Sequence, residues 1–183
     1  MQKAAIVHGV PVITVTGWSN SGKTTFLTQV VRVLTAAGVS VGVIKHHGHK
    51  ATTVDQEGKD TWKYAQAGAN PVVLSSALQY AVFRSTPQGE ATRDELVSRI
   101  ADEVQFVLVE GFRSDAEGAV EVSRKATGKG PKLQPEERIA LVSDDEELVA
   151  QVKAEGKPVF ALDDFAGAAR YFCELAGVEA PQL

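Results

Sequence analysis

The stretch VTGWSNSGKTTFL, residues 15–27, decides the fold of this chain, because its glycine-rich loop separates two segments of different hydrophobic periodicity. Residues 11–16 form a run rich in β-branched side chains, which predicts a buried strand that enters the loop. Residues 23–37 carry apolar side chains at helical spacing and precede Gly38, so we expect a helix that ends there. A strand, a glycine loop and a helix in this order predict the start of an α/β fold.

The loop has the residues that bind the phosphates of a nucleotide. Its glycine, four further residues, glycine, lysine and threonine match the phosphate-loop pattern in full. Gly17 and Gly22 let the backbone turn so that its N–H groups point at one anion, and Lys23 adds a positive charge over the β and γ phosphates. The Thr24 hydroxyl would help to coordinate Mg²⁺. The expected nucleotide-binding residues are Gly17, Ser19, Asn20, Ser21, Gly22, Lys23, Thr24 and Thr25; an ordinary glycine-rich turn is the alternative.

Strands and helices alternate through much of the remaining chain. A strand expected at residues 39–45 follows the first helix within the length of a right-handed βαβ crossover, which predicts a parallel pair. Further strands are expected at 71–75, 80–84, 104–109, 119–123, 139–142 and 159–162, and helices at 59–67, 92–103, 146–155 and 165–176. This order predicts a three-layer P-loop NTPase fold, with a largely parallel β-sheet flanked by helices and the ligand site beyond the carboxyl ends of the strands.

Length and composition fit one soluble domain, which we expect to span residues 1–183. The chain is 44% hydrophobic and 23% charged, and no apolar run approaches the roughly 20 residues that cross a membrane. Its net charge of −4 offers no general cationic surface for nucleic acid. The start of the chain lacks the apolar length of a secretory signal, and the single cysteine, Cys173, suits a reducing compartment. We therefore expect a cytoplasmic protein that binds neither nucleic acid nor membrane.

Glu110 is the candidate acid for a metal site. It closes the apolar run at residues 106–109 and precedes Gly111, so it lies where an acid at the end of a parallel strand can face the metal of a phosphate loop. We expect Thr24 and Glu110 to hold Mg²⁺. The alternative is a solvated carboxylate at the end of a strand.

Two groups in the segment after residue 45 leave alternatives open. His46, His47 and His49 could bind a divalent metal or a phosphorylated ligand, or could belong to an ordinary polar loop. Either Asp55 or Asp60 could orient the attacking water of a nucleotide hydrolase, and Asp60 is the catalytic candidate that we choose. Helix capping by either aspartate is equally consistent with the sequence.

A basic stretch and a tryptophan stand out from the pattern. Residues 124–132 contain four cations and two glycines, which fits either a mobile anion-binding loop or a solvated one. Trp18 occupies the position where one group of dimeric phosphate-loop ATPases carries an extra lysine, and we expect it to make a contact rather than to cover the loop. The chain has no Asn/Thr-Lys-x-Asp element of the kind that reads guanine, so no motif fixes the base.

Five segments together resemble the molybdopterin-guanine dinucleotide biosynthesis protein B family, a small GTP-binding group: GWSNSGKTTFL, VGVIKHHGH, GKDTWKYAQAGA, VLVEGFR and IALVSDD. The resemblance implies a homodimer with a Mg²⁺-dependent GTP site and weak GTPase activity. It implies that the molybdenum cofactor guanylyltransferase is a partner, with molybdopterin as a possible ligand. It further suggests that Ser143 and Asp144 read guanine, and a carboxylate can accept the two N–H bonds that guanine offers.

The preferred hypothesis is a GTP-binding accessory protein of molybdenum cofactor maturation that hydrolyses GTP slowly, with Lys23, Asp60 and Glu110 as catalytic residues. A small-molecule kinase, with residues 124–132 as a lid, is one alternative. A non-catalytic adaptor, in which bound nucleotide orders the surface that meets the partner, is another.

Overall fold

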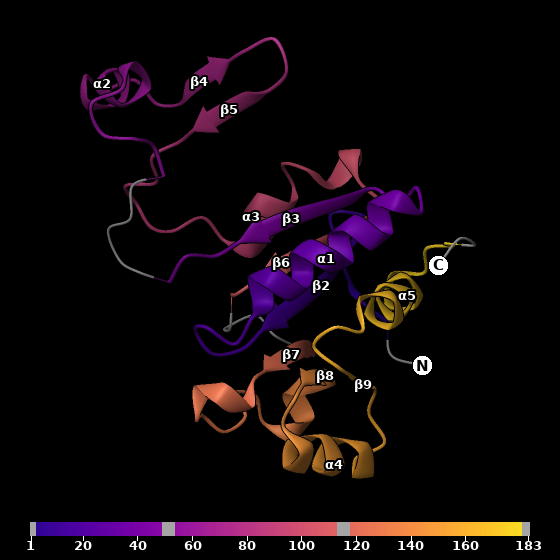
Figure 1. Ribbon diagram of the computed structural model, residues 1–183. Helices are drawn as coiled ribbons and strands as arrows, with labels where there is room; N and C mark the ends of the chain where they lie inside the picture. Colours follow the sequence, from indigo (N-terminus) through magenta and orange to yellow (C-terminus); the bar gives the residue numbers. More distant parts are fainter. Residues whose placement is uncertain (1–2, 49–53, 113–117, 181–183) are drawn as a thin grey trace. The chain divides into compact units, whose positions relative to one another are not determined.

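A strand of mostly β-branched residues lies in the middle of the main sheet. β2 (Val10–Thr16) pairs in parallel with β6 (Phe106–Glu110) on one side and with β7 (Ala119–Ser123) on the other. The computed structural model, which describes residues 3–48, 54–112 and 118–180, gives the strand order β3-β6-β2-β7-β8-β9 (Figure 1). The remaining strands of this order are β3 (Val41–Lys45), β8 (Arg138–Ser143) and β9 (Val159–Phe160). The neighbours in this order run parallel, which confirms the largely parallel sheet.

Helices cover both faces of this sheet. α1 (Lys23–Ala36) and α5 (Phe165–Ala176) bury their apolar residues on one face, in a core that includes Ile13, Phe106 and Phe172. On the other face α3 (Arg93–Val97) buries Val97 against β2 and β6, and α4 (Glu146–Ala154) packs on Leu141 of β8. The structure therefore has the three layers that the alternation of strands and helices predicts.

The expected direct pairing of the strand at residues 39–45 with the first strand is wrong, because β6 lies between β3 and β2. Composition explains the order. β6 is apolar up to Glu110 and buried throughout, as an inner strand must be, whereas β3 contains Gly42 and the half-exposed Val43, which suit the edge of the sheet.

The helix expected at residues 92–103 is also shorter than the sequence indicates. α3 ends at Val97, and a 3₁₀ turn follows at Ala101–Glu103. The chain leaves the helix so that Ile100 and Val104 can lie on Gly42 of β3, where an added Cβ would come within 2.8 Å of the Ile100 side chain. Packing on the edge strand thus overrides the helical periodicity of the segment.

One strand was not expected. β1 (Ala5–Val7) pairs antiparallel with β2 through a two-residue turn, in which His8 and Gly9 have φ of 49° and 82°. Positive φ at both positions is the hairpin geometry that matches the twist of the flanking strands, and glycine at the second position favours it. The pair His8-Gly9 between two apolar runs is therefore a signal that sequence reasoning could have used.

By its internal contacts the chain divides into two compact units. Unit 1 comprises residues 1–46 and 93–183 and contains the main sheet; unit 2 comprises residues 47–92. Unit 2 contains α2 (Asp60–Gln66) and an antiparallel pair, β4 (Val72–Ser75) and β5 (Tyr80–Phe83). None of the helices in residues 3–48, 54–112 and 118–180 is both long enough and apolar enough to cross a membrane.

Candidate functional site

The glycine loop joins the carboxyl end of β2 to the start of α1, as the motif predicts. Gly17 lies directly against β7, and a Cβ at this position would come within 2.1 Å of the carbonyl oxygen of Val122. Gly22, with φ of 90°, has the left-handed conformation in which the chain enters the helix, and Asn20 also has a positive φ of 65°. Glycine at position 17 is therefore required by space, and at position 22 it is favoured by backbone conformation.

The Lys23 side chain folds back over the loop. Its Nζ donates hydrogen bonds to the carbonyl oxygens of Gly17, at 3.1 Å, and Trp18, at 2.7 Å. Burial lowers the pKa of Lys23, with Glu110 acting to raise it and the neighbouring Lys132 and Lys45 to lower it further. An ammonium group held by carbonyl oxygens beside other cations is available to an incoming anion, because a phosphate oxygen is a stronger acceptor than a neutral carbonyl.

Thr24 and Glu110 are in direct contact, as expected for two residues of one metal site. The Thr24 hydroxyl lies 2.9 Å from Oε1 and 3.0 Å from Oε2 of Glu110, a carboxylate that is 7% exposed. Lys45 joins them, with its Nζ 3.0 Å from Thr24 Oγ1 and 3.5 Å from Glu110 Oε1. The register of the sheet explains the contact, because Lys45 and Glu110 are Cα partners at the ends of β3 and β6.

The donor set of this cluster fits Mg²⁺. A hydroxyl and a carboxylate are hard oxygen donors, and Mg²⁺ in nucleotide sites takes one or two protein ligands and fills the remaining positions with water and phosphate oxygens. No group of three or more histidine, cysteine, aspartate or glutamate side chains within the described residues could hold a metal ion. His46 and His47 thus show no metal cluster, and His49 lies outside the described residues.

The other expected loop residues lie around the same turn. Ser19, Asn20 and Thr25 are exposed to solvent, whereas Ser21 is 1% exposed. The Ser21 hydroxyl finds no hydrogen-bond partner in the parts of the chain that the structure describes. The loop therefore exposes the side chains of Ser19, Asn20 and Thr25 to solvent and buries the hydroxyl of Ser21.

The two aspartates of the segment after residue 45 belong to unit 2. Asp55 accepts hydrogen bonds from the backbone N–H of Gln56 and from the Thr61 hydroxyl, so it links the turn before α2 to the first turn of the helix. Asp60 is the first residue of α2; its side chain is 88% exposed and pairs with Lys63 at 3.3 Å. The N-cap of α2 is Lys59, with no capping hydrogen bond from a side chain, so the expected helix capping by Asp55 or Asp60 is not found; a catalytic role for Asp60 stays a prediction.

The expected base-reading residues lie at the end of β8 in unit 1. Ser143 is buried, and its hydroxyl accepts the backbone N–H of Asp145 at 3.0 Å. Asp144 is exposed; its Oδ1 accepts the backbone N–H of Lys125 at 2.7 Å, and its Oδ2 lies 3.8 Å from Arg124 Nε. Asp144 therefore holds the start of the basic stretch at residues 124–132.

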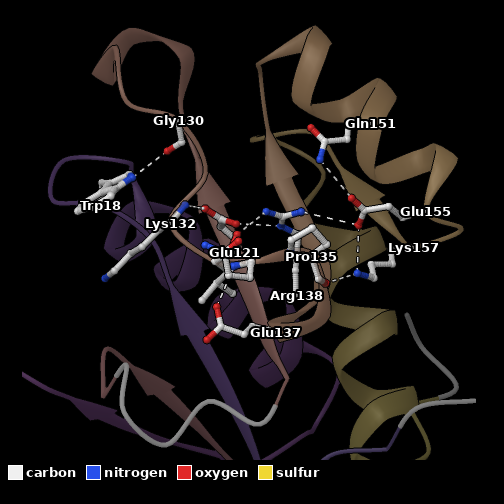
Figure 2. A network of polar contacts seen from close by, with 12 residues as sticks. Trp18, Glu121, Gly130, Lys132, Pro135, Glu137, Arg138, Gln151, Glu155 and Lys157 are labelled. Carbon is white, nitrogen blue, oxygen red and sulfur yellow. Dashed lines mark hydrogen bonds and ion pairs between the residues drawn. The ribbon is translucent and has the colours of Figure 1, made fainter.

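The basic stretch returns to the glycine loop at its other end (Figure 2). The indole Nε1 of Trp18 donates a hydrogen bond of 2.8 Å to the carbonyl oxygen of Gly130. The ammonium groups of Lys129 and Lys132 lie 5.0 Å and 5.8 Å from the centre of the same indole ring, within the range of a cation–π contact. Lys132 Nζ also donates to the carbonyl oxygen of Gly17 at 3.1 Å. Trp18 thus contacts the basic stretch of its own chain.

A buried ion pair anchors this stretch. Glu121 of β7 is fully buried, and its Oε2 lies 2.8 Å from Nε of Arg138, a residue of β8 that is 1% exposed. The other oxygen of Glu121 accepts the backbone N–H of Lys132, and Nη2 of Arg138 donates to the carbonyl oxygen of Leu133 at 3.0 Å. Sequence reasoning missed Glu121, Arg138, Lys132 and Lys45 as individual residues. For Glu121, Arg138 and Lys45 the available signal was a charge inside or at the end of an apolar strand run.

Comparison with known proteins identifies relatives over most of the chain. Residues 12–144 match the family model described as molybdopterin guanine dinucleotide synthesis protein B. The molybdopterin-guanine dinucleotide biosynthesis adapter protein of Haemophilus influenzae is 37% identical over 58% of this chain and 59% of its own length. The probable adapter protein of Bacillus subtilis is 33% identical over 87% of this chain and 90% of its own length. The crystal structure of Bacillus subtilis MobB has a TM-score of 0.70 at 26% identity, covering 91% of this chain and 98% of that one.

Proposed function

The chain belongs to the molybdopterin guanine dinucleotide synthesis protein B family, and on that premise we propose that it is a GTP-binding accessory protein of this synthesis with weak, Mg²⁺-dependent GTPase activity. The observation that carries the proposal is the contact between Thr24 and Glu110 beside Lys23. It brings a hydroxyl, a carboxylate and an ammonium group to one end of a glycine loop, which is the set that phosphoryl-transfer sites use.

The residues of this cluster have separate roles in the proposal. Lys23 exchanges its carbonyl partners for phosphate oxygens and stabilises the charge that develops on them. Thr24 and Glu110 hold Mg²⁺, which neutralises charge on the phosphates when it is bound. Asp60 remains the candidate that orients the attacking water. Wild-type protein incubated with GTP and Mg²⁺ should release free phosphate slowly, and Lys23→Ala and Glu110→Gln should abolish the release; phosphate transfer to a small hydroxylated acceptor would favour a kinase instead.

We assign guanine recognition to Ser143 and Asp144, because the Asp144 carboxylate is exposed at the end of β8 and can accept two N–H bonds from guanine. The test is the ratio of GTP to ATP affinity, measured by titration calorimetry on the wild type and on Asp144→Ala. Asp144 also holds the basic stretch through Lys125 N, but a loosened stretch would weaken both nucleotides alike. A preference for GTP that is lost in Asp144→Ala supports the assignment, and equal binding of both nucleotides by both proteins would refute it.

A nucleotide-gated adaptor is a second candidate, favoured by the adapter-protein names of the relatives. In this form of the proposal the bound nucleotide orders the surface that meets the partner, the molybdenum cofactor guanylyltransferase, with molybdopterin as a possible shared ligand. Lys23→Ala should then lose partner binding together with nucleotide binding. Partner binding that survives the loss of nucleotide would contradict it.

We also propose that the protein works as a homodimer in the cytoplasm. Support for the dimer comes from unit 2, where Val73 of β4 and Val82 of β5 are register partners and share one face of the strand pair with Tyr80. These three side chains are 59%, 52% and 69% exposed. Light scattering after size exclusion should give a dimer for the wild type and a monomer for Val73→Glu/Val82→Lys. The double variant eluting as a dimer would place the interface elsewhere.

A further inference from the structure

We propose that Lys132 is a second phosphate-binding lysine, which the basic stretch, residues 124–132, holds against the glycine loop. This inference rests on the proposed function, because it assigns a further residue to the same site. The ligand chemistry is the polyphosphate chain of a nucleoside triphosphate. Four observations support it: the place of the Lys132 ammonium group, the charges around it, the anchoring of the loop and the contact with Trp18.

The Lys132 ammonium group converges with that of Lys23. Both Nζ atoms donate to the carbonyl oxygen of Gly17, each at 3.1 Å, so the two nitrogens lie within about 6 Å of one another. The proximity of Lys132 also contributes to lowering the pKa of Lys23. Two like charges directed at one neutral oxygen repel each other, and a multiply charged anion placed between them would relieve that repulsion.

A third cation adds to this arrangement. Lys45 Nζ lies 3.0 Å from Thr24 Oγ1, at the start of the same helix, and its charge also acts on Lys23. The chain as a whole carries a net charge of −4, so this concentration of lysines does not reflect a generally basic protein. Glu110 lies 3.5 Å from Lys45 Nζ and offsets one of these charges, but three lysines against this carboxylate leave a local excess of positive charge, which indicates a site for an anion.

The backbone of Lys132 is fixed from the interior of the protein. Its N–H donates to the fully buried Glu121, and the carbonyl of the next residue, Leu133, accepts from Arg138. Because Glu121 and Arg138 pair with each other at 2.8 Å, the two contacts form one buried unit. Loops that merely face solvent do not need such an anchor. Here it places one lysine against the first glycine of the phosphate loop.

Trp18 links the glycine loop to the basic stretch. It lies within the glycine loop, donates its indole N–H to the carbonyl oxygen of Gly130 (Figure 2) and contacts Lys132 with its ring. The hydrogen bond from Lys132 to the carbonyl oxygen of Gly17 also links the two loops. Lys132 can exchange the carbonyl of Gly17 for a phosphate oxygen while the bond between Trp18 and Gly130 keeps the loops together. A charged acceptor forms the stronger hydrogen bond, so a phosphate oxygen would replace the Gly17 carbonyl as the acceptor of the Lys132 ammonium group.

The test compares four full-length proteins by titration calorimetry with GTP and with inorganic triphosphate: wild type, Lys132→Met, Lys132→Arg and Lys129→Met. Lys129 is the matched control, since it lies in the same loop and over the same indole ring but is exposed to solvent. Loss of a charged hydrogen bond should weaken both ligands about tenfold to a hundredfold in Lys132→Met. Lys132→Arg should recover most of the affinity, and Lys129→Met should stay within about threefold of wild type.

Equal affinities in Lys132→Met and wild type, or equal losses in Lys132→Met and Lys129→Met, would overturn the proposal. Circular dichroism of each variant shows whether its fold is intact. Inorganic triphosphate separates this inference from the proposed function: if the wild type binds triphosphate through Lys132 but has no preference for GTP, the inference stands and the guanine assignment falls. If GTP binds well and Lys132→Met changes nothing, the proposed function stands and the inference falls.

Discussion

The ion pair of Glu121 and Arg138 is buried, so the loss of stability on breaking it can be predicted. Arg138→Met removes the cation and leaves a fully buried carboxylate that, among the described residues, keeps its hydrogen bond from the backbone N–H of Lys132. Breaking a buried pair from one side costs about 3–5 kcal/mol, because the surviving charge stays out of water without its partner. We therefore expect Arg138→Met to lower the free energy of unfolding by about 3 kcal/mol or more.

Replacing both partners should cost much less than the two single changes together. In Glu121→Leu/Arg138→Met no buried charge is left, and apolar residues of similar volume often replace such pairs with little loss. The double-mutant cycle should accordingly give a coupling energy of about 2 kcal/mol. Urea denaturation followed by circular dichroism measures each corner of the cycle. Asp94→Asn is the control, because its partner Arg93 lies 3.1 Å away but the Asp94 side chain is 56% exposed, so a change below about 1 kcal/mol is expected.

Two results would refute this reasoning. An Arg138→Met protein that loses less than about 1 kcal/mol would show that the other contacts of Glu121 suffice for the buried charge. Additive losses around the cycle would show that the two side chains do not stabilise each other, whatever their distance. Glu121→Gln, which keeps the shape of the side chain, gives a milder perturbation if Arg138→Met fails to fold.

Three further outcomes are expected from the same structure. Gly17→Ala should abolish triphosphate binding and lower the free energy of unfolding in urea by about 2 kcal/mol, because the new Cβ would meet the Val122 carbonyl. Gly22→Ala has open space around the new Cβ but a positive φ, so it should lower the free energy of unfolding by about 1 kcal/mol. Burial chiefly lowers the pKa of Lys23, so its charged form destabilises the ligand-free fold, and this loss disappears as the pH rises toward 10.5. Lys23→Met should therefore raise the melting temperature at neutral pH, and raise it less at alkaline pH. Cys173 is 4% exposed and burial raises the pKa of its thiol, so a maleimide should label it only as fast as the protein opens; rapid labelling of native protein would contradict its burial.

Local patterns in the sequence predicted the parts of the fold that depend on neighbours along the chain. The loop at residues 17–24 lies between a strand and a helix, and the last helix has the expected bounds, Phe165–Ala176, because strong periodicity and a following Gly177 define it. The position of Glu110 beside Thr24 also followed from the sequence, since the ends of parallel strands meet at one edge of the sheet.

Contacts between distant segments were beyond such reasoning. No local pattern shows that β6 enters between β2 and β3, because the choice of strand neighbours depends on burial over the whole sheet. The pairing of Glu121 with Arg138 depends on the register of β7 and β8, which includes an irregularity between Ala119 and Val120. The place of Lys132 against Gly17 follows from that pairing. The sequence showed a density of cations at residues 124–132 but not which of them reaches the site.

The chain's two tryptophans lie in different compact units, Trp18 in the glycine loop of unit 1 and Trp62 in α2 of unit 2. Each unit therefore contains one intrinsic fluorophore. Trp62→Phe leaves emission from unit 1 alone, and Trp18→Phe leaves emission from unit 2 alone. Melting curves of these two proteins, followed by tryptophan fluorescence, compare the transition temperatures of the two units. A shared midpoint means that the units unfold cooperatively, and separate midpoints mean that residues 47–92 fold independently.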